Sequence, residues 1–291
     1  MSRGRWIALA AGLGGLALLL GGYLWQQDPD RQVASAREAL DAHDLAVAEA
    51  GFRKAAALDP LHLGALEGLG WTYQVAGQQA AAEAAFQRCV EIDAAALGCL
   101  RGLASVKMGK GELSKAREIL EGAEALDPAD PKLQASRGLL ELAEGEVDRG
   151  AARYEALVAR FPDEAEYRVG LAEARLRQRR LEEALAVVDE GLTLRDAPTR
   201  TRALLSLLRA RILVASVVGR IEGMRGQPDC EESATALRAW LDAADLAVTD
   251  ARQTGVRLPT LNEVGRLVGR ARGSIEDACP PRLDAPPAAS N

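Results

Sequence analysis

Side chains that could perform chemistry are scarce in this chain of 291 residues. It contains two histidines, His43 and His62, and four cysteines that lie far apart in two pairs. The chain therefore has too few histidines for a histidine-rich metal site and only two candidates for a catalytic histidine. The sequence also lacks a phosphate-binding GxxxxGK loop, an HExxH pair, a GxSxG elbow and a GxGxxG between a strand and a helix. We therefore expect a protein that is not an enzyme and that uses no cofactor and no metal.

Three features that look chemical have a simpler structural interpretation. The Gly109-Lys110-Gly111 turn resembles a phosphate-binding loop, but no strand precedes it and it falls at a turn position that recurs along the chain. His43 occupies that turn position earlier, and His62 lies in a loop between predicted helices, so we interpret both as solvated side chains. Most carboxylates fall on outward helical faces, where charged residues usually form a wet surface.

The overall composition is that of an ordinary folded protein. The chain is 48% hydrophobic and 27% charged, which excludes collagen-like, disordered and disulfide-dense miniature proteins. Its net charge of −6, with the two signs mixed, argues against a nucleic-acid partner. Most basic residues are arginines, which together with the abundant alanine is typical of a GC-rich bacterial genome.

The first thirty residues have the pattern of a membrane anchor. Arg3 and Arg5 precede an uncharged run of 20 residues from Trp6 to Trp25. At ~1.5 Å per residue, such a helix would cross the roughly 30 Å hydrocarbon core. The charge asymmetry predicts a cytoplasmic segment at 1–5, a transmembrane signal-anchor helix at 6–25 in the bacterial inner membrane, and the remainder in the periplasm or outside. A cleaved signal peptide is the competing interpretation. Such a peptide needs small residues at both the −3 and −1 positions of the cleavage site, and the end of the apolar run does not provide them well.

The chain after residue 28 repeats itself every 34 residues. The markers are an aspartate near a proline position, a small residue, a bulky residue and a turn residue. The aspartates are Asp59, Asp93 and Asp127, and the small residues are Ala48, Ala82, Ala116 and Gly150. The bulky residues are Phe52, Phe86, Leu120 and Tyr154, and the turn residues are His43, Gly77, Gly111 and Gly145. A repeat of this length is the signature of a stacked repeat protein.

This pattern resembles the tetratricopeptide repeat, a helix–turn–helix unit. Leu69-Gly70, Tyr73, Gly77, Ala82, Phe86 and Asp93 match its signature in order. We interpret 29–198 as five repeats at 29–62, 63–96, 97–130, 131–164 and 165–198. The resemblance implies an all-α, right-handed superhelix with a concave surface. After the repeats we expect a capping helix at 199–224, a helical hairpin at 230–279 and a disordered tail at 280–291.

The cysteines are placed for pairing. Cys230 precedes one predicted helix and Cys279 follows the next, and these ends meet in an antiparallel hairpin, so we expect a disulfide. Cys89 and Cys99 are about equally far from a turn; they either form a second bridge or remain as buried thiols in small-residue positions. Pairable cysteines favour an oxidising compartment, in agreement with export.

The resemblance also implies where a partner would bind, because the concave surface comes from the first helix of each repeat. The corresponding residues are Arg37, Glu67, Trp71, Gln74, Arg101, Ser105, Met108, Leu139, Leu142, Glu173 and Arg177. Their apolar and aromatic side chains suit an extended or helical peptide. The lysines and asparagines of chaperone-binding repeats are missing, so a C-terminal carboxylate is not the expected ligand. The alternative is that the C-terminal helices of the chain itself cover this surface.

Three classes of function are consistent with these features. The favoured one is a membrane-anchored scaffold or adaptor that faces the periplasm and binds a protein partner of the cell envelope. A second is a permanent structural subunit of a larger membrane complex, such as cytochrome c maturation, secretion or pilus machinery. The third, an enzyme or small-molecule binder built on the C-terminal module, lacks a supporting motif.

Overall fold

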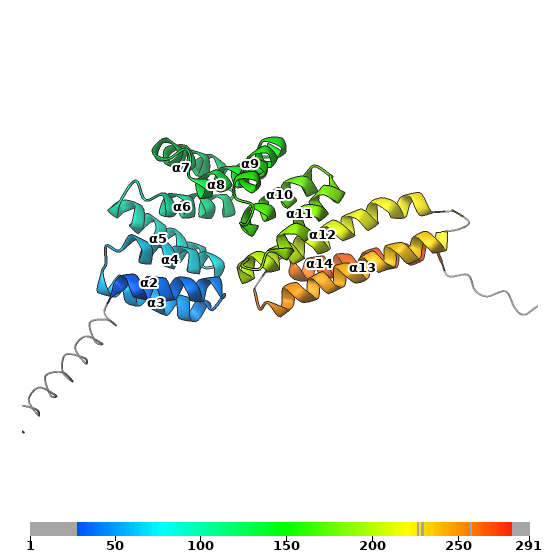
Figure 1. Cartoon of the computed structure of the whole chain (residues 1–291), viewed down its shortest axis with the longest axis horizontal. Coiled ribbons are helices and arrows are strands. Elements are labelled where there is room, and N and C mark those ends of the chain that lie inside the picture. Colours follow the sequence, from blue (N-terminus) through cyan, green and yellow to red (C-terminus); the bar gives the residue numbers. More distant parts are fainter. Residues whose placement is uncertain (1–27, 226, 228–229, 257, 281–291) are drawn as a thin grey trace, which may run out of the picture. The chain divides into compact units, whose positions relative to one another are not determined.

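The computed structural model describes residues 28–225, 227, 230–256 and 258–280 (Figure 1). Within these residues it contains thirteen α-helices and no strand. The chain divides into two compact units, with the boundary between Ala129 and Asp130. The predicted all-α architecture is therefore confirmed for the part of the chain that the structure describes.

Both units are built from antiparallel helix pairs. The helices of the first unit are α2 (Pro29–Asp41), α3 (Leu45–Leu58), α4 (Leu63–Val75), α5 (Gln79–Ile92), α6 (Leu97–Gly109) and α7 (Leu113–Leu126). Those of the second are α8 (Pro131–Ala143), α9 (Val147–Arg160), α10 (Ala165–Arg177), α11 (Leu181–Thr193), α12 (Thr199–Met224), α13 (Cys230–Gln253) and α14 (Leu261–Ala278). The pairs α2–α3, α4–α5, α6–α7, α8–α9 and α10–α11 occupy the five predicted repeats.

Each of these pairs turns through the same hydrogen-bonded motif. In the turn from α4 to α5, Gln78 N–H donates to the Tyr73 carbonyl at 2.8 Å and Gly77 N–H to the Gln74 carbonyl at 3.1 Å. This is a Schellman motif, and it requires a left-handed backbone at the residue after the helix cap. The residue there has a φ between 60° and 84° in all five turns. These residues are His43, Gly77, Gly111, Gly145 and Arg179.

Large rings pack onto glycines of their own repeat or of the next one. Phe86 of α5 is fully buried, and a Cβ placed at Gly70 or Gly102 would lie 2.4 Å or 2.2 Å from its ring. Phe52 on Gly68 and Tyr154 on Gly170 are packed in the same way. Because glycine has no side chain, the neighbouring helix can approach close enough for the ring to fill the space between repeats.

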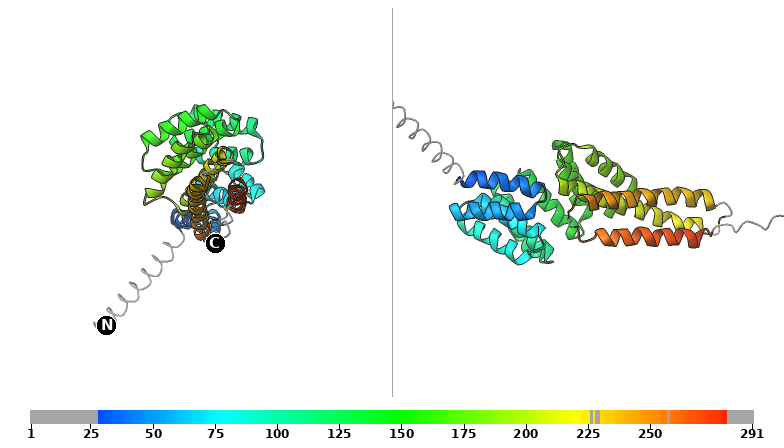
Figure 2. Two further views of the ribbon diagram at one scale, coloured as in Figure 1. Left: turned by 90° about the vertical axis from the view of Figure 1, so that its right-hand side faces the viewer. Right: turned by 90° about the horizontal axis from the view of Figure 1, so that it is seen from below.

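The long helix α12 joins the repeats of the second unit to its C-terminal module. Leu205, Leu208 and Ile212, in its first half, lie in a buried cluster with residues of α10 and α11. Val217 and Ile221, in its second half, lie in another cluster with residues of α13 and α14. Figures 1 and 2 show α13 and α14 running side by side along this second half. The apolar side chains that α12 carries on several faces are thus buried on both sides.

The structure contains two disulfides. Cys230 at the start of α13 is bonded to Cys279 just after α14, with a Cα–Cα distance of 5.8 Å. Cys89 of α5 is bonded to Cys99 of α6, with a Cα–Cα distance of 6.1 Å, and both residues are buried. Of the two interpretations of Cys89 and Cys99, the structure therefore has the bridge rather than the free thiols.

Some predicted segments lie outside the described residues. They are the cytoplasmic segment at 1–5, the anchor at 6–25 and all of the predicted tail except Pro280. Among the helices that the structure describes, none combines the length and apolar character needed to span a bilayer.

Candidate functional site

In the first unit, the first helix of the second repeat, α4, carries a tryptophan whose orientation is fixed by its neighbours. Trp71 of α4 is half-buried and meets Phe86 edge to face, with ring centroids 5.2 Å apart and an interplanar angle of 74°. Its indole N–H donates to Glu67 Oε1 at 3.3 Å, one turn earlier on the same helix. An aromatic pair of this geometry adds about 0.5–1.5 kcal/mol beyond area burial, so the ring is oriented before any ligand arrives.

Glu67 connects this tryptophan to the next first helix. Its Oε1 lies 3.8 Å from Arg101 Nη2, and a Cβ placed at Gly98 would be 2.3 Å from that same oxygen. Gly98 is in the first turn of α6, where the helix dipole favours a negative charge. Glu67 therefore holds Trp71, Arg101 and the start of α6 in one network.

The remaining predicted residues of the first unit fall into two groups. Gln74 Nε2 donates to Ser105 Oγ at 2.6 Å, so these two side chains link α4 to α6. Met108 is half-buried on α6, and Arg37 is exposed on α2. We call the surface formed by Glu67, Trp71, Gln74, Arg101, Ser105 and Met108 the α4/α6 surface.

Two of the predicted residues in the second unit lie in a charged cluster. Glu173 of α10 accepts from Arg177 Nε at 3.0 Å through Oε1 and from Arg211 Nη1 at 2.7 Å through Oε2. Arg177 Nη1 also donates to the Leu142 carbonyl of α8 at 2.6 Å. Burial alone would raise the pKa of Glu173, but the charges of Arg211 and Arg177 outweigh it, so that the pKa lies below its ordinary value.

Sequence reasoning missed Arg211. It belongs to α12, beyond the last recognisable repeat, so no repeat position pointed to it. A helical wheel of 199–224 marks it only as one of several polar positions on an apolar helix.

The two leucines predicted on the binding surface of the second unit have different environments. Leu139 is 47% exposed, whereas Leu142 is 1% exposed. Leu142 packs over Gly150 of α9, where an added Cβ would lie 2.9 Å from its side chain, and it shares a buried cluster with Tyr154 and Leu171. The prediction for Leu142 is therefore wrong, because the side chain is buried among α8, α9 and α10.

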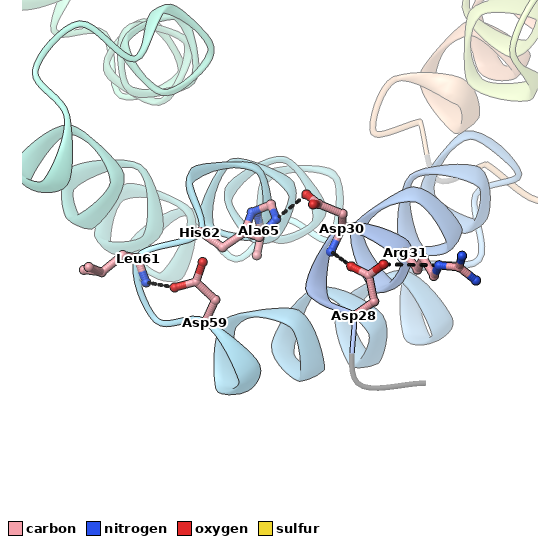
Figure 3. Close-up of polar contacts among 7 residues, drawn as sticks. All are labelled: Asp28, Asp30, Arg31, Asp59, Leu61, His62 and Ala65. Carbon is pink, nitrogen blue, oxygen red and sulfur yellow. Dashed lines mark hydrogen bonds and ion pairs between the residues drawn. The ribbon is translucent and has the colours of Figure 1, made fainter. Parts of the chain in front are cut away.

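The prediction that His62 is a solvated histidine is also wrong. Its Nδ1 accepts from Ala65 N–H at 3.3 Å at the start of α4, and its Nε2 lies 2.9 Å from Asp30 Oδ1 (Figure 3). The side chain is only 16% exposed. A neutral ring with its proton on Nε2 satisfies both contacts, so His62 caps α4 and ties it to the start of α2.

The Gly109-Lys110-Gly111 segment is a structural turn whose lysine is paired. Gly111 has the left-handed φ of 76° that the Schellman turn needs. Lys110 Nζ contacts Glu83 Oε2 on α5, and Lys107 Nζ lies 2.5 Å from Glu83 Oε1. These contacts connect the turn to the preceding repeat. Among the described residues, no group of three His, Cys, Asp or Glu side chains is placed to hold a metal ion.

Comparison with known proteins agrees with the repeat pattern. Two tetratricopeptide-repeat profiles match the chain, one at residues 63–95 and one at residues 135–200. The crystal structure of a thermophilic TPR protein from Thermus thermophilus has a TM-score of 0.54 and 25% identity, covering 62% of this chain and 98% of that one. No curated protein matched the sequence.

Two further solved structures show the same fold at lower identity. A chain of the APC/C hetero-tetramer Cut9–Hcn1 has a TM-score of 0.57 and 15% identity, over 84% of this chain and 43% of that one. PilW, a widely conserved type IV pilus biogenesis factor, has a TM-score of 0.51 and 15% identity, over 81% of this chain and 97% of that one. The profile matches coincide with the helix pair α4–α5 and with the pairs α8–α9 and α10–α11. The chain therefore contains tetratricopeptide repeats.

Proposed function

We propose that this protein is a non-catalytic scaffold that binds a protein or peptide partner through the first helices of its repeats. It is anchored in the bacterial inner membrane by residues 6–25, and its repeats face the periplasm, where the partner belongs to a cell-envelope assembly. The repeats support the binding role, since stacked helix pairs of this kind serve as extended interaction surfaces. The charge asymmetry around 6–25 and the four paired cysteines support the location.

The observation that carries the binding role is the state of Trp71. The ring is half-buried rather than part of a closed core, yet both Phe86 and Glu67 fix its orientation. Tryptophan and arginine are among the residue types most enriched at binding hot spots. Pre-orientation lowers the entropy lost on binding, which is the advantage that an adaptor surface needs.

The test is in-cell crosslinking from a photoreactive residue at Met108, followed by affinity purification of the full chain from its own membrane. Trp71→Phe keeps a ring against Phe86 but removes the indole, and we expect it to lower capture of a specific partner about fivefold or more. Arg101→Glu, which places a second carboxylate beside Glu67, should have the same effect. Trp240→Phe makes the same change at a half-buried tryptophan of α13 and serves as the matched control.

The outcomes separate the candidate functions. Loss of one envelope partner in Trp71→Phe and Arg101→Glu, but not in Trp240→Phe, supports the scaffold. Capture that all three variants leave unchanged would contradict the α4/α6 surface and favour a permanent structural subunit held through other faces. The location is tested separately by carbonate extraction of membranes and by protease access in spheroplasts. Release by carbonate, or protection of the repeats from external protease, would contradict the anchor or its orientation.

A further inference from the structure

In the cluster of Glu173, Arg177 and Arg211, one carboxylate is paired with two guanidinium groups, so the cluster has an excess positive charge. Arg177 alone reaches both Glu173 and the Leu142 carbonyl, and thereby completes the link between α10 and α8. Arg211 adds a second guanidinium to a carboxylate that already has one. The cluster thus has two positive charges against one negative charge, in a chain whose net charge is −6.

The arginine donors are only partly used. A guanidinium has five N–H donors, and Arg211 uses one of them on Glu173 among the contacts of the described residues. Both oxygens of Glu173 are engaged, since Oε1 meets Arg177 and Oε2 meets Arg211. The Arg177 and Arg211 side chains are 43% and 38% exposed, whereas that of Glu173 is 20% exposed. The accessible part of the cluster is therefore its donor side.

The helix that Arg177 contacts, α8, also carries an exposed apolar side chain, Leu139. Leu139 precedes Leu142 by three residues of α8, which is about 4.5 Å along the helix axis. The Leu142 carbonyl is the group that Arg177 holds, so the backbone of Leu139 lies about one helical turn from the α8 end of the cluster. Leu139 remains 47% exposed although it stands in a helix of a closely packed repeat.

We propose that Arg177 and Arg211 bind an acidic side chain of a partner peptide, with Leu139 receiving a neighbouring apolar side chain. The proposal rests on the peptide-binding function and names the chemistry of the partner at this point. Guanidinium–carboxylate contacts are charge-assisted and planar, so a glutamate or aspartate fits the free donors, while a lysine would be repelled. Glu173 competes with the incoming carboxylate for the same two arginines.

The experiment is isothermal titration calorimetry of the full chain in a nonionic detergent. The probes are three synthetic peptides of 12 residues in which leucines are separated by glutamates, by glutamines or by lysines. We expect the glutamate peptide to bind about tenfold more tightly than the glutamine peptide, which is the gain of roughly one charge-assisted contact. The lysine peptide should give no measurable heat.

Four variants locate the effect. Arg211→Gln should weaken glutamate-peptide binding about fivefold or more, and Arg211→Lys less, because a lysine keeps the charge but not the planar fork. Arg209→Gln removes an arginine two positions away on α12, which instead pairs with Asp189 at 2.8 Å, and should leave binding within about twofold. Glu173→Gln should strengthen binding about threefold or more by releasing both arginines, a gain that a merely structural role would not produce. Circular dichroism checks that each variant is folded.

Three results would overturn the assignment. One is equal binding of the glutamate and glutamine peptides, which would leave peptide binding in place but remove its acidic specificity. Another is an equal loss in Arg209→Gln and Arg211→Gln, since that would indicate a diffuse field rather than a site. A weaker affinity in Glu173→Gln would contradict the competition between carboxylates. Failure of all three peptides to bind would count against the proposed peptide-binding function as well.

Discussion

At the scale of single residues, the packing between repeats depends on pairing a large ring with a missing side chain. Phe86 lies against Gly70 and Gly102, and an added Cβ at either glycine would overlap the ring. The ring is completely buried, so it has no free space into which it could move. The glycines are therefore required by the aromatic residue rather than by the backbone conformation of α4 or α6.

Gly102→Ala should destabilise the first unit, by up to about 2 kcal/mol. The cost of overpacking, about 1–3 kcal/mol, exceeds the helix-propensity gain of about 1 kcal/mol. Gly122→Ala is the control, because Gly122 is within α7 and an added Cβ meets nothing within 4 Å there; it should be stabilising. Urea unfolding of both variants measures the difference. A stabilising Gly102→Ala would contradict the packing argument, and Phe86→Leu combined with Gly102→Ala should lose less than the two single changes together.

A second residue-scale effect concerns pH. Hydrogen bonds from Lys107 and then Lys110 lower the pKa of Glu83, and burial opposes them only in part. A carboxylate with a lowered folded pKa contributes stability above its ordinary pKa of about 4.3, and the contribution is lost as the pH falls through the lower folded value. Glu83→Gln should therefore be less stable than the wild type at pH 7, and the difference should disappear as the pH falls through the lowered folded pKa of Glu83. Thermal unfolding across this range is the measurement, and a constant difference would show that the effect is not titration of Glu83.

At the scale of elements, the turn within each repeat depends on one left-handed residue. Glycine supplies it in three turns, whereas His43 and Arg179 adopt it with a full side chain. The left-handed conformation costs a residue with a Cβ about 1–2 kcal/mol. Glycine avoids this cost but loses more conformational entropy on folding, so only part of the roughly 1–2 kcal/mol remains as an advantage of glycine. The first and last repeats thus have the more strained turns.

Arg179→Gly should stabilise the second unit by about 0.5–1 kcal/mol for this reason. Arg180→Gly is the matched control, because Arg180 has a φ of −87° and gains nothing from glycine. Chemical unfolding of the two variants side by side tests the prediction. An unchanged or lower stability of Arg179→Gly would mean that the arginine side chain compensates for the backbone strain.

At the scale of the whole molecule, each compact unit contains one disulfide. Cys89–Cys99 joins two neighbouring repeats of the first unit, and Cys230–Cys279 closes the C-terminal module of the second. The C-terminal module is also stabilised by Arg272 of α14, which contacts Asp242 at 2.8 Å and Asp245 at 2.6 Å on α13. The sequence separations are 10 and 49 residues, so the two bonds constrain the unfolded chain to different extents.

Removing each bond should destabilise only the unit that contains it. In the chain-entropy account, Cys230→Ser with Cys279→Ser costs about 4 kcal/mol, and Cys89→Ala with Cys99→Ala costs about 3 kcal/mol. Hydrogen exchange followed by mass spectrometry reads the protection of α4–α6 and α12–α14 separately. Equal losses of protection in both units from either double variant would show that the units unfold as one.

Particular residues show how far sequence reasoning reached into the candidate site. The repeat period placed Trp71, Glu67 and Arg101 on the first helices, and all three meet in one network. The same rule predicted that Leu142 is on the surface, but the side chain is buried. A repeat position alone does not specify the direction in which a side chain packs. Arg211 stood outside the period and could be linked to Glu173 only by the packing of α12 on α10.

The sequence by itself determined the helix pairs, their 34-residue period and the turn positions. These features depend on contacts close along the chain: apolar spacing, small residues and a left-handed turn residue. Only the tertiary structure decided that His62 contacts Asp30, that Leu142 is interior, and that Glu173 binds Arg211. The two contacts join side chains that are 32 and 38 residues apart in the sequence, and the burial of Leu142 depends on which neighbouring helices pack against it. A repeat pattern in the sequence specifies neither.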